Sequence, residues 1–266
     1  MPHRPLMFAA IDGAVMDAAD AQISVLDDGL LRGDGVFEVL RIYAGRPFGL
    51  DEHLERMARS AETLRLAFDE AAVRADVAAL IEAGGAIDAG LRLVLTRGGR
   101  RIALLEPPKV FPASTALATI TYSPTRLLDG VKSLSYGANM LATRLAKEAG
   151  ADEALLVTPH GRVLEAPVAA FFYVLGGELC TPPLSDRILD SISRRVLLAT
   201  ADARERVTTL DDLATISEAF LASSLREVQP VRSIDGQSLP CVSGPVSAAA
   251  AEHVREHIEA ALQPLA

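Results

Sequence analysis

The chain has 266 residues, of which 50% are hydrophobic and 23% are charged, and its formal net charge at pH 7 is −9. This composition is that of a soluble globular protein and excludes a largely disordered chain. The negative charge argues against nucleic-acid binding. A local phosphate site is still compatible with it, because helix amides and one arginine can bind a phosphate.

The two cysteines, Cys180 and Cys241, lack the spacing of a metal site or a disulfide framework. No segment reaches the roughly 18 apolar residues of a membrane-spanning helix. We therefore expect a cytoplasmic protein without metal, membrane or nucleic-acid partners.

Residues 1–120 predict a small N-terminal α/β domain. Apolar runs on either side of an Asp-Gly pair favour a hairpin, and apolar residues spaced by three and four favour helices. Asp51 is the expected N-cap of the first helix. The expected elements are a β-hairpin turning at Asp12-Gly13, a strand at 36–43, helices at 51–66 and 69–83, and a strand at 91–96 that ends at Arg97-Gly98-Gly99.

Residues 121–266 predict a larger C-terminal domain. A strand at 110–122 leads through Ser123-Pro124 into the expected linker, which places the domain boundary near residue 120. Strands and helices follow without a regular βαβ rhythm, so the predicted fold class is α+β. The expected elements are a helix at 137–149, strands at 153–157, 171–174 and 178–180, and helices at 192–203 and 244–262.

A lysine and a distant glutamate suggest the chemistry of the chain. Lys132 lies in the segment Val-Lys-Ser-Leu-Ser-Tyr at 131–136, and Glu165 follows 33 residues later. An aldehyde cofactor must be held by an amine, while its pyridine nitrogen must stay protonated to withdraw electrons. Lys132 would supply the amine and Glu165 the counter-charge.

Segments along nearly the whole chain resemble one known family, the fold-type IV pyridoxal 5′-phosphate (PLP) enzymes. This family includes branched-chain aminotransferases, D-amino acid aminotransferases and aminodeoxychorismate lyases. The resemblance implies a smaller N-terminal α/β domain and a larger C-terminal pseudo-barrel domain that carries the PLP lysine. The segments are Ser-Val-Leu-Asp-Asp-Gly-Leu-Leu-Arg-Gly-Asp-Gly-Val-Phe-Glu at 24–38, the run from His53 to Ser60, the lysine segment, and Gly-Ala-Asp-Glu-Ala-Leu-Leu at 150–156.

The resemblance also implies a phosphate site. Arg56 matches the family's arginine in the first helix, and a guanidinium is suited to bidentate phosphate binding. The Ile192 amide and the Ser193 hydroxyl open a helix, where amides attract phosphate, while Ser191 can act as the N-cap at the same time. Ser224 falls where a hydroxyl meets the phosphate.

Two further residues near these positions keep alternative roles. His53 lies one helical turn before Arg56 and either supports it or is a structural histidine. Tyr136 either hydrogen-bonds the phenolic oxygen of the cofactor or packs at a junction between strand and helix.

The resemblance implies three substrate-binding residues. Arg100, in the basic loop from Thr96 to Arg101, would reach a substrate carboxylate, the alternative being a solvated turn. The Leu225 amide would contact the same carboxylate. Phe37 would line the pocket without the phenol that a tyrosine would provide.

The chain departs from the family pattern after Glu165. The family commonly has Glu-Gly and then a small polar segment ending in Asn, whereas this chain has Ala-Pro-Val-Ala-Ala at 166–170. Because polar neighbours tune a cofactor, this loss bears on the type of reaction.

The residues and the resemblance together predict an aminotransferase that moves an amino group between an amino acid or amine and a 2-oxo acid. Lys132 would act as the base, with PLP as cofactor and a homodimer as the assembly. One alternative is an aminodeoxychorismate lyase, which releases pyruvate to form 4-aminobenzoate. Another is a non-catalytic relative that binds PLP.

Overall fold

The computed structural model describes residues 7–262, which its contacts divide into two compact units. The first unit contains residues 7–109, 131–136 and 261–262, and the second contains residues 110–130 and 137–260. The segment with Lys132 therefore belongs to the first unit by its contacts, whereas the sequence grouped it with residues 121–266. Ser133 forms an isolated antiparallel bridge with Val36, which explains this placement.

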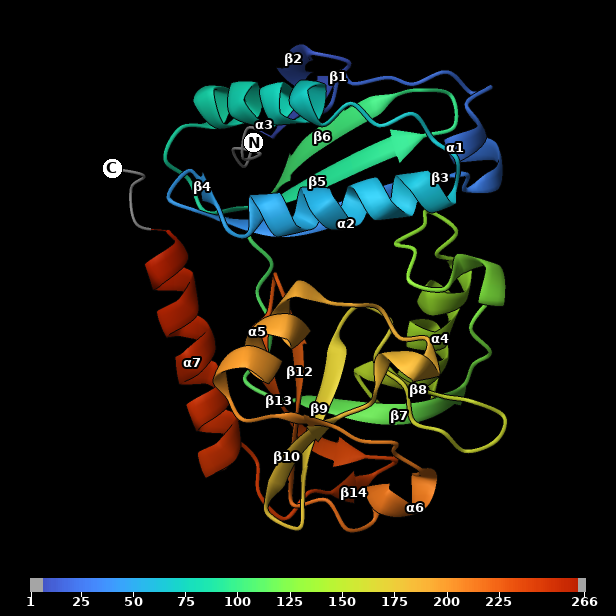
Figure 1. Ribbon diagram of the computed structural model, residues 1–266, viewed down its shortest axis with the longest axis vertical. Helices are drawn as coiled ribbons and strands as arrows, with labels where there is room; N and C mark the ends of the chain where they lie inside the picture. The colour runs from blue at the N-terminus through green and yellow to red at the C-terminus, as the bar shows by residue number, and fades with distance from the viewer. Residues whose placement is uncertain (1–6, 263–266) are drawn as a thin grey trace. The chain divides into compact units, whose positions relative to one another are not determined.

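The first unit is built on a six-stranded sheet in the order β2-β1-β6-β5-β3-β4, in which neighbouring strands are antiparallel (Figure 1). Its first two strands form the expected hairpin, with Asp12 and Gly13 in the turn at positive φ. The strands are β1 (Phe8–Ile11), β2 (Ala14–Asp17), β3 (Gly35–Tyr43), β4 (Arg46–Pro47), β5 (Ala89–Thr96) and β6 (Arg101–Glu106).

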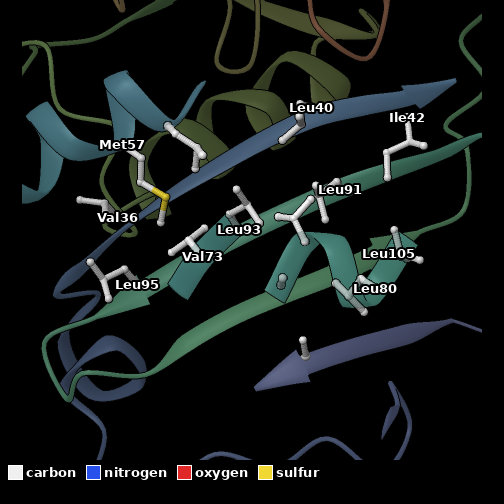
Figure 2. Close-up of a cluster of buried hydrophobic side chains, with 14 of the residues drawn as sticks. Val36, Leu40, Ile42, Met57, Val73, Leu80, Leu91, Leu93, Leu95 and Leu105 are labelled. Atoms are coloured by element: carbon white, nitrogen blue, oxygen red, sulfur yellow. The ribbon is translucent and has the colours of Figure 1, made fainter. Parts of the chain in front are cut away.

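Two helices, α2 (Leu50–Thr63) and α3 (Glu70–Gly84), pack against this sheet. Alternate strand residues point toward them, because successive side chains of a strand face opposite sides. Figure 2 shows the resulting core, in which the branched side chains of β3 and β5 meet those of the two helices. The labelled members are Val36, Leu40, Ile42, Met57, Val73, Leu80, Leu91, Leu93, Leu95 and Leu105.

The structure corrects several local predictions. Asp51 is not the N-cap of α2, because Gly49 takes that position in the left-handed conformation and the helix begins at Leu50. A short helix, α1 (Asp28–Arg32), was not predicted; the Asp27 carboxylate caps it. Strand β6 was also missed, and it completes a hairpin with β5 across the Arg97-Gly98-Gly99 turn.

The second unit contains an eight-stranded mixed sheet that curls into a half-barrel (Figure 1). Its order is β11-β10-β9-β12-β13-β7-β8, and β14 pairs with β13. The pairs β13–β7, β7–β8 and β10–β11 are parallel. The strands are β7 (Thr115–Thr121), β8 (Glu153–Val157), β9 (Ala170–Leu175), β10 (Glu178–Thr181), β11 (Arg204–Glu205), β12 (Glu218–Ser223), β13 (Glu227–Ile234) and β14 (Gln237–Ser238).

Three helices of the second unit, α4, α5 and α7, begin close to the predicted positions, whereas the short helix α6 was not predicted. Helix α4 packs on β7 and β8, and α5 packs on β12. Helix α5 ends three residues earlier than the predicted 203. The helices are α4 (Gly137–Glu148), α5 (Ile192–Thr200), α6 (Leu210–Leu213) and α7 (Pro245–Ala261), with single 3-10 turns at Arg126–Leu128 and Leu184–Asp186.

Within residues 7–262, no helix is long and apolar enough to cross a membrane. The same part of the chain contains no group of three or more histidine, cysteine or acidic side chains placed to hold a metal ion. Cys180 and Cys241 are not joined in a disulfide.

Candidate active site

Lys132 lies on a short extended segment that is hydrogen-bonded to β3. The Phe37 amide donates to the Lys132 carbonyl at 3.0 Å, and the Leu134 amide donates to the Gly35 carbonyl at 2.9 Å. From the other side, the Lys132 amide donates to the Ser60 hydroxyl of α2 at 3.2 Å. Because its backbone is held by a strand and a helix, the position of the lysine is fixed before any ligand binds.

The Lys132 amine lies against two aromatic rings. Its nitrogen is 4.5 Å from the centroid of the Phe37 ring and 6.0 Å from that of Tyr136. The two rings form an edge-to-face pair with centroids 5.2 Å apart. Such a pair is rigid and apolar, and it orients the amine while leaving the lysine only partly buried. Phe37 therefore lies beside the candidate catalytic amine.

Gly35 permits the close approach of the lysine segment to β3. A Cβ atom at this position would lie 2.5 Å from the Leu95 carbonyl oxygen and 2.6 Å from Cδ1 of Leu134. Both distances are far inside van der Waals contact. Packing thus explains why the second glycine of the Gly33-Asp34-Gly35 run, Gly35, has no side chain.

We expect Gly35→Ala to lower the free energy of unfolding by about 1–3 kcal/mol, because the new methyl group must push apart β5 and the lysine segment. Urea unfolding measures this. Gly137→Ala is the matched control, since a Cβ there meets nothing within 4 Å, and its effect should stay within about 1 kcal/mol. Equal stabilities of the two variants would contradict the packing argument.

Arg56 is held by a buried network with Glu38 and His53. Its Nε and Nη2 atoms donate to the two Glu38 oxygens at 2.7 and 2.6 Å, and His53 Nδ1 lies 2.7 Å from Oε2. The Glu38 side chain is fully buried. His53 therefore contacts the carboxylate that also binds Arg56, and this buried position is compatible with both of its expected roles.

Burial and charge shift the pKa values of this network. Burial opposes ionisation of Glu38, but the Arg56 guanidinium and the hydrogen bonds of Arg56 and His53 outweigh it, and the pKa of Glu38 is lowered to about 2. Burial lowers the pKa of His53, although Glu38 acts in the opposite direction. At neutral pH the network is therefore a carboxylate, a guanidinium and a neutral imidazole.

The lowered pKa values of Glu38 and His53 predict that the fold loses stability in acid. Both pKa values are depressed, so both groups stabilise the folded state above their unfolded pKa, and that contribution is lost as the pH falls. The loss begins below about 6.5 for His53 and extends for Glu38 from about 4.5 down to about 2. We expect Glu38→Gln to flatten the decline of unfolding free energy between pH 4.5 and 2.

At pH 7 the same variant should be less stable by about 3–5 kcal/mol, because Arg56 loses its buried counter-charge. Chemical unfolding across the pH range measures both effects. Glu55→Gln is the control on the same helix, because the Glu55 side chain is 65% exposed and its pair with Arg59 is long, at 3.9 Å. Parallel pH profiles for Glu38→Gln and the natural protein would contradict the network described above.

The basic turn after β5 is fixed by acidic side chains. Arg97 donates from Nε to Asp34 at 3.0 Å, and Thr96 donates to the buried Asp27 carboxylate at 2.8 Å. The Arg100 guanidinium pairs with Asp12 of the β1–β2 turn and is about half exposed. The structure thus brings Arg97 and Asp34 together in a structural contact, and it pairs Arg100 with Asp12 of the neighbouring β1–β2 hairpin.

In the second unit, Glu165 lies just before the β9 strand and is half-buried. Its Oε1 atom accepts a hydrogen bond from the Leu189 amide at 2.8 Å. Its charge reaches Tyr122, where burial raises the pKa of the phenol and the Glu165 carboxylate raises it further. Glu165 is therefore an oriented carboxylate on a defined backbone, as a partner for a protonated ring nitrogen must be.

The segment after Glu165 forms a tight turn whose polar groups are backbone atoms. The Ala166 amide donates to the Ala169 carbonyl at 3.0 Å, and Asn139 of α4 donates from its side-chain nitrogen to the Pro167 carbonyl at 3.2 Å. An asparagine therefore contacts this turn although the turn itself has none.

Ile192 and Ser193 begin helix α5, as expected. Ser191 is the N-cap, and its hydroxyl accepts from the Arg194 amide. Ile192 and Ser193 are both buried. The first amides of a helix lack partners within the helix, so this end is suited to an anion.

Ser224 lies in the turn between β12 and β13. The Arg226 amide donates to the Ser223 carbonyl at 3.2 Å, which closes the turn over Ser224 and Leu225. Glu227 follows with φ of 55°, in the left-handed region. This is a three-residue hairpin loop with Ser224 and Leu225 at its tip.

The donor set is compatible with PLP. By residue type, Arg56, the α5 amides, and the hydroxyls of Ser193 and Ser224 would each be able to donate to a phosphate, and Glu165 would be able to accept from a pyridinium. Lys132 would supply the amine. Phe37, Arg56, Arg100 and Lys132 all belong to the first unit, where the Lys132 amine contacts the Phe37 ring, whereas Glu165, Ile192, Ser193, Ser224 and Leu225 belong to the second. The sequence analysis overlooked Glu38, although alternation along β3 places it on the helix face and a buried carboxylate there requires a cation.

Comparison with known proteins identifies the family of this chain. The sequence pattern of amino-transferase class IV matches residues 35–234. A putative branched-chain-amino-acid aminotransferase of Methanocaldococcus jannaschii is 36% identical over 254 residues, with 85% of this chain and 88% of the relative covered. A D-alanine aminotransferase of Bacillus licheniformis is 31% identical over 256 residues, which cover 88% and 90%.

A solved structure is also similar. The PLP-bound form of a hypothetical aminotransferase from Mycobacterium tuberculosis has a TM-score of 0.87 at 26% identity, with 96% of this chain and 99% of that chain covered. The expected fold, that of the fold-type IV transaminases, is confirmed. The chain belongs to the class IV aminotransferases, which are PLP-dependent enzymes.

Proposed function

We propose that this enzyme binds PLP through Lys132 and transfers an amino group from an amino acid or amine to a 2-oxo acid. The observation that carries the proposal is the Lys132 amine held against Phe37 and Tyr136 on a segment fixed by β3 and α2. The same observation disfavours a surface role for this lysine. The class IV family and the PLP-bound neighbour support the choice of cofactor.

The phosphate would be bound by Arg56, the Ile192 amide, and the hydroxyls of Ser193 and Ser224. Glu38 and His53 would keep Arg56 in place, since its Nε and Nη2 already donate to the carboxylate. Helix α5 would add the partial positive charge of its N-terminus. Because the Arg56 side chain is already fixed, its contribution to phosphate binding would carry a low entropic cost.

When bound, PLP withdraws electrons from the substrate α-carbon. Glu165 would hold a proton at the pyridine nitrogen and so keep this withdrawal effective. Lys132, released by the amino donor and in its neutral form, would take the proton from the substrate α-carbon. It would hold this proton and give it back later in the transfer. The aromatic pair of Phe37 and Tyr136 would limit water access to the lysine nitrogen.

The substrate carboxylate is assigned in this proposal to the Leu225 amide and to Arg100, with Phe37 lining the pocket. The carboxylate would compete with Asp12 for the Arg100 guanidinium, because the two are paired. Homologous enzymes named for branched-chain amino acids and for D-alanine define the donors to be tested.

A homodimer is part of the proposal. Four apolar side chains gather in α1 and just before it, and each is more than half exposed: Val25, Leu26, Leu30 and Leu31. A patch of this kind on a folded protein commonly marks an interface. Sedimentation equilibrium of the natural chain should give the mass of two copies. The unpaired state of Cys180 and Cys241 is consistent with the proposed cytoplasmic location.

The test is a spectroscopic donor panel. Purified enzyme with PLP should absorb near about 410 nm and shift to about 330 nm when an accepted donor is added, and a 2-oxo acid should reverse the shift. The panel contains L- and D-branched-chain amino acids, L- and D-alanine and an (R)-amine.

The other expected activities give different results in the same assay. Pyruvate release from aminodeoxychorismate without an acceptor would identify the lyase. A stable 410 nm band with every donor would identify a non-catalytic PLP protein, and the absence of any band would contradict PLP binding.

A further inference from the structure

The β12–β13 turn is attached to the rest of its unit by a buried arginine that the proposed reaction does not use. The Arg226 side chain is 4% exposed, and its backbone amide closes the turn that carries Ser224. The side chain runs inward from this turn. Its surroundings therefore determine where the tip of the hairpin lies.

The Arg226 guanidinium has partners on three sides. Nη2 donates to Oε2 of Glu153 at 3.2 Å, and Nη1 donates to Oε1 of Gln229 at 3.0 Å. Its central carbon is 4.9 Å from the centroid of the Phe111 ring. The turn is thus connected to the beginning of β8, to β13 and to the segment before β7.

Each of these partners is itself held. Glu153 accepts a hydrogen bond from the Thr143 hydroxyl of α4 at 2.8 Å, and Gln229 donates to the Pro112 carbonyl at 3.0 Å. The network therefore reaches α4, the helix that follows the lysine segment in sequence. A displacement of Arg226 would disturb all of these contacts together.

Some features of this network destabilise the folded state. Burial lowers the pKa of Arg226, although Glu153 opposes the shift. Among the described residues, the buried Nε atom has no hydrogen-bond partner, which costs about 1–3 kcal/mol. Glu227 adds the strain of a left-handed conformation in a residue with a side chain. Apolar packing would be at least as stable, so stability alone does not explain this arrangement.

We propose that Arg226 is a positioning residue for the cofactor phosphate. Its guanidinium, fixed by Glu153 and Gln229, holds the Ser223–Arg226 turn in the conformation that presents the Ser224 hydroxyl to the phosphate. The proposal rests on the proposed function, because it assumes that this turn binds PLP. It assigns Arg226 no contact with the reacting atoms.

The test compares two ligands that differ only in the phosphate. PLP and pyridoxal are titrated into the apoenzyme, with binding followed at about 410 nm. For Arg226→Met we expect the dissociation constant of PLP to rise by about tenfold or more, while that of pyridoxal stays unchanged. A merely structural role would weaken both ligands equally or only lower the melting temperature.

A double variant keeps the test valid if the single variant folds poorly. Arg226→Met with Glu153→Leu removes both buried charges, so neither is left uncompensated. We expect near-natural stability together with the reduced preference for PLP over pyridoxal. If this variant keeps the natural preference, the positioning role is overturned.

Arg232→Met is the matched control. Arg232 also joins β13 to the residue before β8, through Asp152 at 2.8 Å, but that pair is 43% and 45% exposed. The preference of Arg232→Met for PLP over pyridoxal should equal that of the natural enzyme. A reduced preference would show a general effect of removing an arginine and would count against the role of Arg226. Failure of the natural enzyme to bind PLP at all would instead refute the proposed function.

Discussion

Lys132→Ala is expected to abolish the absorbance near about 410 nm and to lower the transamination rate by about 10⁴-fold, because in the proposed mechanism one residue supplies both the covalent attachment and the base. The fold should persist. The contact of its amine with Phe37 is worth only about 0.5–1 kcal/mol. Steady-state kinetics, absorbance and thermal unfolding together separate loss of chemistry from loss of structure.

The chain offers a simple control, because its three lysines are Lys109, Lys132 and Lys147. Lys147 lies exposed in the last turn of α4. Lys147→Ala should keep full activity. Borohydride reduction of the holoenzyme followed by peptide mass mapping should place the modified lysine at 132. Modification at either other lysine, or turnover by Lys132→Ala, would refute the assignment.

Glu165→Gln should lower kcat/KM by about 10²–10³-fold, because the amide cannot hold a proton at the ring nitrogen as a carboxylate does. Its effect on stability should be small. The Gln carbonyl oxygen can still accept the hydrogen bond that the Leu189 amide now donates to Oε1. The comparison of kcat/KM with the melting temperature therefore isolates the charge of Glu165 from its packing.

Glu148→Gln provides the matched control for this prediction. Glu148 is an exposed carboxylate at the end of α4, and neutralising it should leave kcat/KM unchanged. If Glu165→Gln behaved like Glu148→Gln, another group would have to protonate the pyridine nitrogen. The binding of PLP itself should survive in Glu165→Gln, since the phosphate donors are unchanged.

Several elements of this fold follow directly from local patterns. Alternation along 36–43 and the Asp-Gly pair at 12–13 predicted β3 and the first hairpin because strand faces and tight turns depend on near neighbours. Helix α3 began beside Asp69, whose side chain accepts from the Ala72 amide. The start of α2 was misjudged because Gly49 adopts the left-handed conformation there, and a glycine cap leaves a weaker signal than Asp51 did.

The candidate site was less accessible to sequence reasoning. The type of residue at 132 and 165 indicated the chemistry, but the pairing of the lysine segment with β3 joins residues almost a hundred positions apart. The ion pair of Arg226 with Glu153 is similarly non-local. Glu38 could have been found, since a carboxylate between Val36 and Leu40 on a buried face demands a cation. Only the packing of α2 on the sheet shows that the cation is Arg56.

The hydrogen bonds between the Lys132 segment and β3 limit where the chain can be cut to make fragments or chimaeras. Six residues, 131–136, leave the second unit along the chain and join the first. A fragment ending at Lys109 would contain Phe37 and Gly35 without the hexapeptide that their backbone groups bind. Chimaeras that exchange the first 109 residues with those of a relative would need to exchange the hexapeptide as well.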